Sequence, residues 1–240
     1  MRPIAHIGIV GCSAEGAALC YRTICAEGAV RLGQHAHPEI SVHTPSLADY
    51  VKCLDSHDLD GVAALMLASA DKLARAGADF LICPDNTIHA AFARVAPHSP
   101  LPWLHIADVV ATEAKRRDFR RVGVTGTRWL VQSDIYPGQL SARGIEVVRP
   151  SDEARDEMDR IIMDELVSGV IRPDSVALFR TAIEHFKDHH GCDAVVLGCT
   201  EIPLIIDDRN SVLPTLDSTR LLARAALHRA MSDGNDLTLN

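Results

Sequence analysis

The stretch Ile7-Gly8-Ile9-Val10-Gly11 has a counterpart in Val122-Gly123-Val124-Thr125-Gly126, at a lag of 115 residues (123 − 8). Each is a short run of aliphatic, mainly β-branched residues that ends at a glycine, which is typical of a buried strand entering a tight turn. The pair Asp85-Asn86 corresponds in the same way to Cys199-Thr200, at a lag of 114 residues (199 − 85). Such nearly equal lags predict an internal duplication.

Around these anchors, short strand-like runs alternate with longer stretches of helical periodicity, such as 14–28, 60–76 and 174–190. This alternation predicts an α/β fold with two pseudo-symmetric, parallel-sheet domains. We expect an N-terminal half over 1–112, with part of the C-terminal helix, and a C-terminal half over 113–225. Because ligands of open α/β sheets bind at the carboxyl ends of the strands, we expect the active site in the cleft between the domains.

Composition restricts the partners of the chain. It has 240 residues, 47% of them hydrophobic and 4% aromatic, with a net charge of −8. The acidic balance and few aromatic residues argue against nucleic acid and anionic membranes as partners, and the apolar runs are too short to span a bilayer. Seven cysteines without a CxxC pair, and an N-terminus without a signal-peptide pattern, predict a reduced, cytoplasmic protein with no zinc site.

Cys199 is the strongest candidate for chemistry. It follows the apolar run 194–197 at an expected helix N-terminus, a position that lowers a thiol pKa and exposes the sulfur. Its counterpart in the other half is Asp85, either a helix cap or a buried acid. We predict that both are catalytic, on opposite walls of one cleft. The other cysteines are expected to pack in the core, with Cys83 as an alternative second thiol.

Two further loops carry polar groups. Ser13 lies in the glycine-containing loop 11–16, which either forms a plain strand-to-helix turn or presents its hydroxyl and backbone N–H groups to a small anion. Asn86 and Thr87 are helix caps or hold a substrate carboxylate. The loop 11–16 is neither a GxGxxG nor a Walker A sequence, and none of the four lysines suggests pyridoxal phosphate. We therefore expect no cofactor.

Taken together, the motifs resemble the aspartate/glutamate racemase superfamily over nearly the whole chain. The resemblance rests on the segments 7–11, 86–89, 126–136, 161–169 and 198–202, of which the last, Gly198-Cys199-Thr200-Glu201-Ile202, is the most specific. It implies two pseudo-symmetric domains, a homodimer, no cofactor and a small amino-acid or carboxylate substrate. It also implies that one thiol removes the Cα proton while a second, on the opposite face, returns one.

The resemblance further implies which residues bind substrate. Asn86, Thr87 and Thr200, with nearby amides, would hold the carboxylate, while Ser13 and Thr127 would line the pocket. Glu201 belongs to the same motif as Cys199 and is included in the predicted site.

The sequence departs from the family pattern at two positions. Asp85 stands where the family usually has the first cysteine. Tyr50 stands near the place where aspartate-specific members have an arginine, which makes neutral or bulkier substrates plausible.

The leading hypothesis is a cofactor-independent amino-acid racemase or epimerase that uses Cys199 and Asp85. Two alternatives stay open at this point. One is a one-thiol carbanion enzyme, such as an arylmalonate-type decarboxylase. The other is a non-catalytic binder of small molecules.

Overall fold

The computed structural model describes residues 4–232 of the chain. The residues form two compact units. Of the described residues, the first unit combines 4–106 with 219–232, and the second unit is Ala107–Ser218. The boundary falls at the start of helix α5 (Ile106–Arg116), whereas the sequence-based division placed it after residue 112. Each unit is described separately below.

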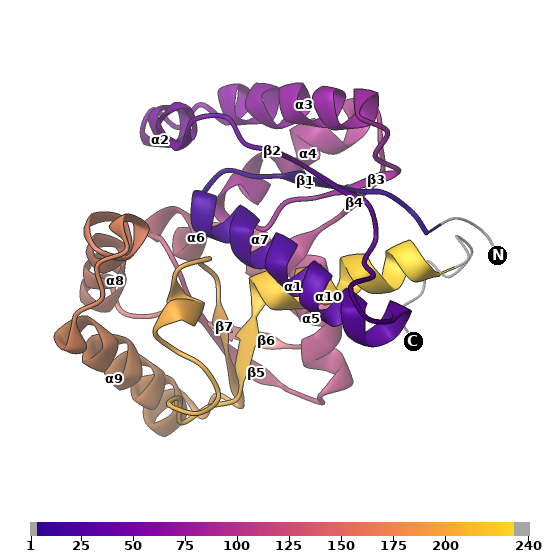
Figure 1. Cartoon of the computed structure of the whole chain (residues 1–240). Helices are drawn as coiled ribbons and strands as arrows, with labels where there is room; N and C mark the ends of the chain where they lie inside the picture. The colour runs from indigo at the N-terminus through magenta and orange to yellow at the C-terminus, as the bar shows by residue number, and fades with distance from the viewer. Residues whose placement is uncertain (1–3, 233–240) are drawn as a thin grey trace. The chain divides into compact units, whose positions relative to one another are not determined.

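The first unit is built on a four-stranded parallel sheet in the order β2-β1-β3-β4. Figure 1 shows α3 on one side of this sheet and α1 and α10 on the other, and Glu27 of α1 pairs with Arg224 of α10 at 2.8 Å. The elements are β1 (Ile7–Val10), α1 (Ala14–Leu32), β2 (Ile40–His43), α2 (Leu47–Asp55), α3 (Leu59–Arg75), β3 (Phe80–Ile82), the 3-10 helix η1 (Thr87–Ala91), α4 (Phe92–Val95), the 3-10 helix η2 (Ala96–His98), β4 (Trp103–Leu104) and α10 (Ser218–Met231).

The second unit repeats this plan with the order β6-β5-β7-β8, again all parallel. Helices α8 and α9 lie on one side of the sheet and α5 on the other (Figure 1). The elements that follow α5 are β5 (Arg121–Thr125), α6 (Arg128–Gln132), α7 (Ile135–Ser141), β6 (Glu146–Val148), α8 (Asp152–Asp164), the 3-10 helix η3 (Leu166–Ser168), α9 (Pro173–His190), β7 (Ala194–Leu197), the 3-10 helix η4 (Ile202–Leu204) and β8 (Thr215–Asp217).

The matching strand orders confirm the predicted α/β class with two similar parallel-sheet domains. The strands β1 and β7 are buried along their whole length, which is why they read as continuous apolar runs. The glycines that marked the repeat have a packing role. A Cβ at Gly123 would come within 2.5 Å of the Phe186 ring, and one at Gly8 within 2.6 Å of Leu81. Glycine therefore lets neighbouring side chains lie directly against each central strand.

Three local features lie beside the candidate residues. Residues 215–217 form strand β8, and α10 starts directly after it at Ser218. Helix α8 ends at Asp164, and Gly169 closes η3 with a φ of 72°. Tyr50 lies in the helix α2.

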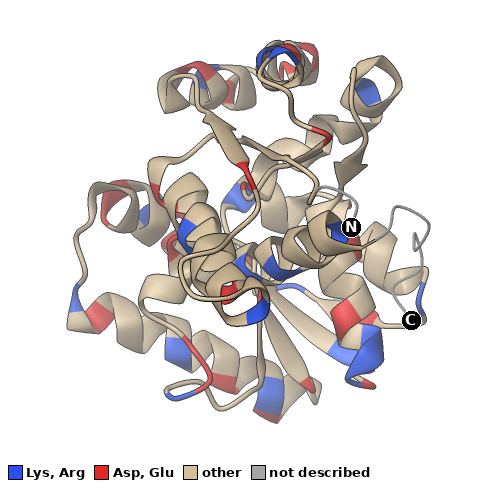
Figure 2. Ribbon diagram, turned by 45° about the vertical axis from the view of Figure 1, so that its right-hand side comes forward, with Lys and Arg blue, Asp and Glu red and all other residues tan. Residues whose placement is uncertain are grey.

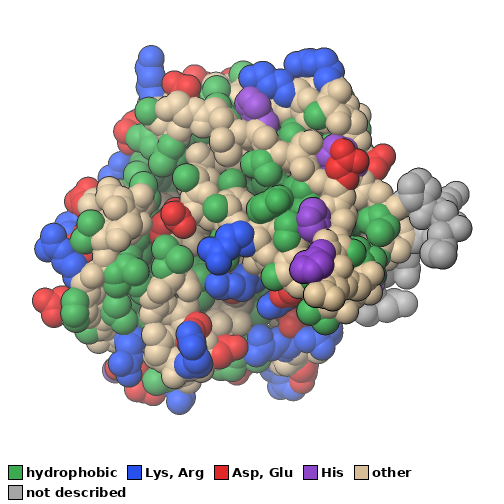
Figure 3. Space-filling view, viewed as in Figure 1, with side chains coloured by type: hydrophobic (Ala, Val, Ile, Leu, Met, Phe, Trp, Pro, Cys, Tyr) green, Lys and Arg blue, Asp and Glu red, His purple; other side chains and the backbone are tan. Residues whose placement is uncertain are grey.

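Charged residues are spread over the surface rather than collected by sign. Acidic and basic residues intersperse along the outer helices (Figure 2), and lysine and arginine form small separate groups on the face in Figure 3. Within residues 4–232, no helix is both long and apolar enough to cross a membrane.

Candidate active site

The predicted residues of the first unit gather at the carboxyl ends of two neighbouring strands. Ser13 follows β1, while Asp85 follows β3. The Asp85 carboxylate joins the two loops, because its Oδ2 accepts the Cys12 N–H at 2.9 Å and its Oδ1 accepts the Ser13 N–H at 3.0 Å. Two such hydrogen bonds favour the ionised carboxylate. We call this cluster, with Asn86, Thr87 and Tyr50, the first half-site.

Ser13 is also the N-cap of α1. Its Oγ accepts the N–H of Gly16 at 3.2 Å, while its own N–H goes to Asp85. Asn86 and Thr87 stand at the start of η1, where Asn86 is buried and Thr87 is partly exposed. The loop 11–16 thus caps α1 and, through its backbone N–H groups, holds the side chain of Asp85.

His89 holds the backbone of the first half-site. Its Nδ1–H donates to the carbonyl oxygen of Asp85 at 2.9 Å, and its Nε2 accepts the N–H of Ile106 at 3.5 Å. A neutral imidazole satisfies both contacts, whereas a protonated ring would oppose one donor with another. Burial, together with the neighbouring His105, lowers the pKa of His89 to about 3. Sequence reasoning missed His89 as a site residue, although it lies in the quoted segment 86–89.

Tyr50, from helix α2, lies within electrostatic range of the same cluster. Its side chain is fully buried, and Ser69 is the polar side chain that interacts with its hydroxyl. Burial raises the pKa of Tyr50, and the nearby Cys83, Cys12 and Asp85 raise it further. Ser69 exerts a smaller opposite effect. The phenol is therefore neutral, and this position provides no positive charge for a substrate.

The second half-site lies at the carboxyl ends of β5 and β7. It consists of Thr127, Cys199, Thr200 and Glu201. Glu201 is only 2% exposed, and its Oε2 accepts two side-chain hydrogen bonds, from Cys199 Sγ at 2.8 Å and from Thr200 Oγ1 at 2.6 Å. Cys199 itself is 8% exposed. The buried carboxylate thus fixes the orientation of both the thiol and the hydroxyl.

Close backbone packing brings together the loop after β5 and the loop after β7. The N–H of Gly198 donates to the carbonyl oxygen of Thr125 at 2.9 Å. A Cβ at Gly198 would lie 2.5 Å from that oxygen and 2.5 Å from Leu130 Cδ2, so only glycine fits immediately before Cys199. Thr127 caps α6, and its Oγ1 accepts the N–H of Leu130 at 3.4 Å.

None of the described cysteines forms a disulfide, and among the described residues no cluster of three or more His, Cys, Asp or Glu side chains could hold a metal ion. Cys83, the alternative second thiol, is fully buried, and its Sγ points to the carbonyl oxygen of Asp85 at 3.7 Å. Burial raises its pKa well above the ordinary value, and Asp85 raises it further. Cys83 is thus kept as a neutral thiol.

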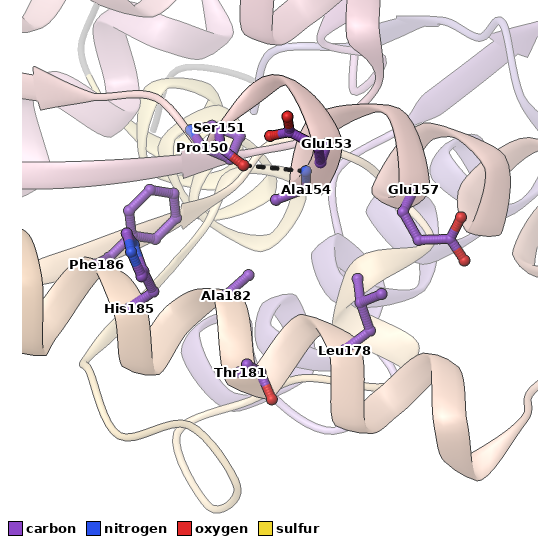
Figure 4. A pocket seen from close by; sticks show the side chains of 10 residues that line it. All are labelled: Pro150, Ser151, Glu153, Ala154, Glu157, Leu178, Thr181, Ala182, His185 and Phe186. Carbon is purple, nitrogen blue, oxygen red and sulfur yellow. Dashed lines mark hydrogen bonds between the residues drawn. The ribbon is translucent and has the colours of Figure 1, made fainter.

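A separate groove of about 480 Å³ lies between α8 and α9. Glu153 and Glu157 of α8 stand on one side of it, while Leu178 and His185 of α9 stand on the other (Figure 4). None of the predicted site residues lines this groove. The candidate chemistry therefore rests on the strand-end clusters and not on the groove.

Comparison with known proteins decides the family. The model of the Asp/Glu/Hydantoin racemase family matches residues 7–226, which include both half-sites. The chain belongs to this family. Its relatives include the broad-specificity amino-acid racemase RacX of Bacillus subtilis, which is 27% identical over 174 residues, covering 71% of this chain and 73% of RacX. Members of the family are racemases, so the chain is an isomerase.

Solved structures agree with this racemase assignment. An Asp/Glu racemase candidate from Yersinia pestis is 30% identical, with a TM-score of 0.86 over 95% of this chain and 100% of that one. An aspartate racemase homologue from Pyrococcus horikoshii OT3 is 28% identical, with a TM-score of 0.81 over 95% of this chain and 100% of that one. The predicted resemblance and fold are thereby confirmed.

Proposed function

We propose that the chain is a cofactor-independent amino-acid racemase or epimerase in which Cys199 transfers the Cα proton on one side of the substrate. The supporting observation is the hydrogen bond of the Cys199 thiol to the buried carboxylate of Glu201, at 2.8 Å. Such a carboxylate orients the sulfur and offers an acceptor for its proton. A thiol with an adjacent acceptor is suited to general acid–base catalysis.

Inversion at Cα needs a second proton-transfer group on the opposite face, because a planar carbanion is reprotonated from the side that holds a donor. We assign this role to the first half-site, with Asp85 at its centre. The proposal requires both half-sites to act on one substrate carbon. Racemisation in this form needs no metal and no cofactor.

Without a cofactor, the negative charge of the carbanion must spread onto the substrate carboxylate, which hydrogen-bond donors stabilise. We propose that Asn86, Thr87 and Thr200 provide these donors and that Ser13 and Thr127 line the pocket. The hydroxyl of Thr200 donates its one proton to Glu201 at 2.6 Å. We therefore propose that Thr200 holds the substrate carboxylate through its backbone N–H.

The neutral Tyr50 favours substrates with neutral or bulky side chains over aspartate. A distal carboxylate would need a cation, and the buried phenol of Tyr50 provides none. RacX, a relative, has broad specificity, which fits such a pocket. We further propose a cytoplasmic homodimer, in line with the family resemblance.

The experiment compares wild type with Cys199→Ala on single enantiomers of a panel of amino acids in D2O. We expect wild type to exchange the Cα hydrogen and racemise at least one amino acid. Cys199→Ala should lose this activity by about 10³-fold. Cys192→Ala is the matched control, because Cys192 is also a buried thiol of the second unit, and burial raises its pKa to about 11.

Full exchange by Cys199→Ala would refute the assignment of this thiol. Release of CO2 from substituted malonates, without Cα exchange of amino acids, would indicate a one-thiol decarboxylase instead. Binding of amino acids without exchange would indicate a non-catalytic binder.

A further inference from the structure

His43 is the last residue of β2, and its backbone supports the first half-site. Its carbonyl oxygen accepts the N–H of Gly11 at 3.0 Å. Gly11 immediately precedes Cys12, whose own N–H binds the Asp85 carboxylate at 2.9 Å. The parallel pairing of β2 with β1 places His43 opposite Val10. The carboxyl end of β2 therefore borders the loop that holds Asp85.

The side chain of His43 contacts helix α3. Its Nδ1 lies 3.0 Å from Ser69 Oγ, and its Nε2 lies 2.9 Å from Lys72 Nζ. The Lys72 ammonium can only donate, so Nε2 accepts from it and the proton of the neutral imidazole is on Nδ1. This Nδ1–H donates to the Ser69 hydroxyl oxygen. The two contacts together assign one tautomer to His43.

Lys72 also keeps the imidazole of His43 neutral. The strand β1 brings the uncharged Val10 and Gly11 beside His43, and α3 brings Ser69 and Lys72. Burial lowers the pKa of His43, and the positive charge of Lys72 lowers it further. A protonated ring would also turn an N–H toward the Lys72 ammonium, which is itself a donor. The neutral Nδ1–H form is therefore favoured.

Ser69 connects this imidazole to Tyr50. The Ser69 side chain is fully buried, and it is the polar side chain that interacts with the Tyr50 hydroxyl. Asp85 of the first half-site acts electrostatically on the same hydroxyl. The contacts thus form one line, Lys72–His43–Ser69–Tyr50, which starts at an exposed lysine and ends beside the first half-site. We call this line the polar chain.

We propose that His43 and Ser69 are positioning residues of the racemase, which hold the Tyr50 phenol in place beside Asp85. This inference rests on the proposed function. A buried hydroxyl is unfavourable unless a hydrogen bond replaces its hydration, so Ser69 determines where the phenol lies. His43 in turn holds the Ser69 oxygen. Neither residue exchanges a proton with the substrate.

The effect of the polar chain should fall on turnover rather than on substrate binding. Tyr50 interacts electrostatically with Asp85, to which we assign a proton transfer, and it is not one of the donors proposed for the substrate carboxylate. A displaced phenol changes the packing and the field around Asp85. Proton transfer depends steeply on alignment, so kcat should fall while KM changes little.

The first test compares variants of the whole chain on the amino acid that wild type racemises. His43→Asn keeps an N–H donor near the place of Nδ1, whereas His43→Gln extends its amide toward Lys72 and loses the contact with Ser69. We expect His43→Gln and Ser69→Ala to lower kcat about 10-fold with an unchanged KM. His43→Asn should keep a kcat close to that of wild type.

Thr23→Ala is the matched control for Ser69→Ala. The Thr23 hydroxyl also donates to a carbonyl oxygen four residues earlier in a helix of the first unit, at 2.7 Å, but it lies outside the polar chain. This variant should keep the wild-type kcat. An unchanged kcat in both His43→Gln and Ser69→Ala would overturn the proposal, and so would a raised KM with an unchanged kcat.

A second test needs no turnover. In proton–nitrogen NMR spectra of the chain with isotope-labelled histidine, His43 should show the Nδ1–H tautomer, with its signals assigned by their loss in His43→Asn. Lys72→Met should raise the pKa of His43, because the charge that opposes protonation is gone. The control Lys52→Met, on α2, should leave this pKa as it is. An Nε2–H tautomer, or a pKa that Lys72→Met does not move, would overturn the polar chain.

The two proposals fail separately. If wild type racemises no amino acid but His43 shows the expected tautomer and pKa change, the racemase function is refuted and the contacts of His43 are supported. If wild type racemises an amino acid and neither His43→Gln nor Ser69→Ala changes kcat, the positioning role is refuted and the racemase function stands.

Discussion

The two half-sites hold their carboxylates differently. In the first half-site, each oxygen of Asp85 accepts a backbone N–H, one from Cys12 and one from Ser13. In the second, a single oxygen of Glu201 accepts the side chains of Cys199 and Thr200. A backbone N–H cannot give up a proton, whereas a thiol can. The backbone contacts of Asp85 therefore fix its position, while Glu201 is coupled to a thiol that can change its protonation.

This difference shows how a duplicated fold diverges. The strand order is the same in both units, and both clusters lie at the carboxyl ends of the two central strands. The shared strand order therefore determines the position of the polar residues, at the carboxyl ends of the central strands. The identity of its hydrogen-bond partners then decides whether the group holds a charge or moves a proton.

The largest effect should come from neutralising the second carboxylate. Glu201→Gln keeps an oxygen acceptor but removes the charge, so the thiol of Cys199 loses its proton acceptor. We expect kcat/KM for racemisation to fall about 10³-fold, or about 4 kcal/mol of transition-state stabilisation. The pH midpoint of Cys199 alkylation should also fall, since a carboxylate no longer opposes the thiolate.

Asp85→Asn provides the comparison for this variant. It should move the midpoint of Cys199 alkylation less than Glu201→Gln does, because Glu201 contacts the Cys199 sulfur directly. If Asp85→Asn moved that midpoint as far as Glu201→Gln does, the separate roles of the two carboxylates would be wrong.

The next largest effect concerns the backbone of the first half-site. The pKa of His89 is lowered to about 3 in the folded chain by burial and His105, against about 6.5 in an unfolded chain. Between these values the unfolded state binds more protons, so stability is full above the unfolded pKa and falls as the pH drops. We expect this group to account for about 3 kcal/mol of lost stability between about pH 6.5 and about pH 4.

His89→Gln should flatten this pH dependence, as measured by urea unfolding across that pH range. The exposed His98→Gln is the control and should leave the slope as it is in wild type. An unchanged slope in His89→Gln would show that His89 is not the group that titrates.

The sequence predicted the strand ends at which the candidate residues lie. It predicted the short helices less well. The repeat lag located Asp85 and Cys199 at equivalent strand ends, because glycine and β-branched residues mark buried parallel strands. Cys12 carried no such signal, since its contact with Asp85 is made by the backbone N–H and any residue type could make it. The helix around Tyr50 was missed because a nine-residue helix after a proline has few periodic positions.

A smaller effect should come from the tight approach before Cys199. Gly198→Ala places a Cβ within 2.5 Å of Thr125 O, so the loop must shift. We expect a loss of about 2 kcal/mol in the free energy of unfolding, together with lower activity because the sulfur moves. Pro84 holds the equivalent place before Asp85 (198 − 84 = 114), so the first half-site tolerates a side chain there.

Gly138→Ala is the matched control for this prediction. Nothing lies within 4 Å of a Cβ at that position of helix α7, so alanine should stabilise the chain by about 0.5–1 kcal/mol. Equal destabilisation by both substitutions would mean that the close contact at Gly198 does not constrain the loop.

The smallest effects distinguish the two helix caps. Ser13 Oγ accepts the Gly16 N–H at 3.2 Å and Thr127 Oγ1 accepts the Leu130 N–H at 3.4 Å. Ser13→Ala and Thr127→Ala should each cost about 1 kcal/mol of unfolding free energy. We propose that both residues also line the pocket, so both variants should raise KM as well. Ser13→Thr and Thr127→Ser retain the hydroxyl and should restore both properties. If the alanine variants unfold at lower urea concentration but keep the wild-type KM, the two residues cap their helices and do not line the pocket.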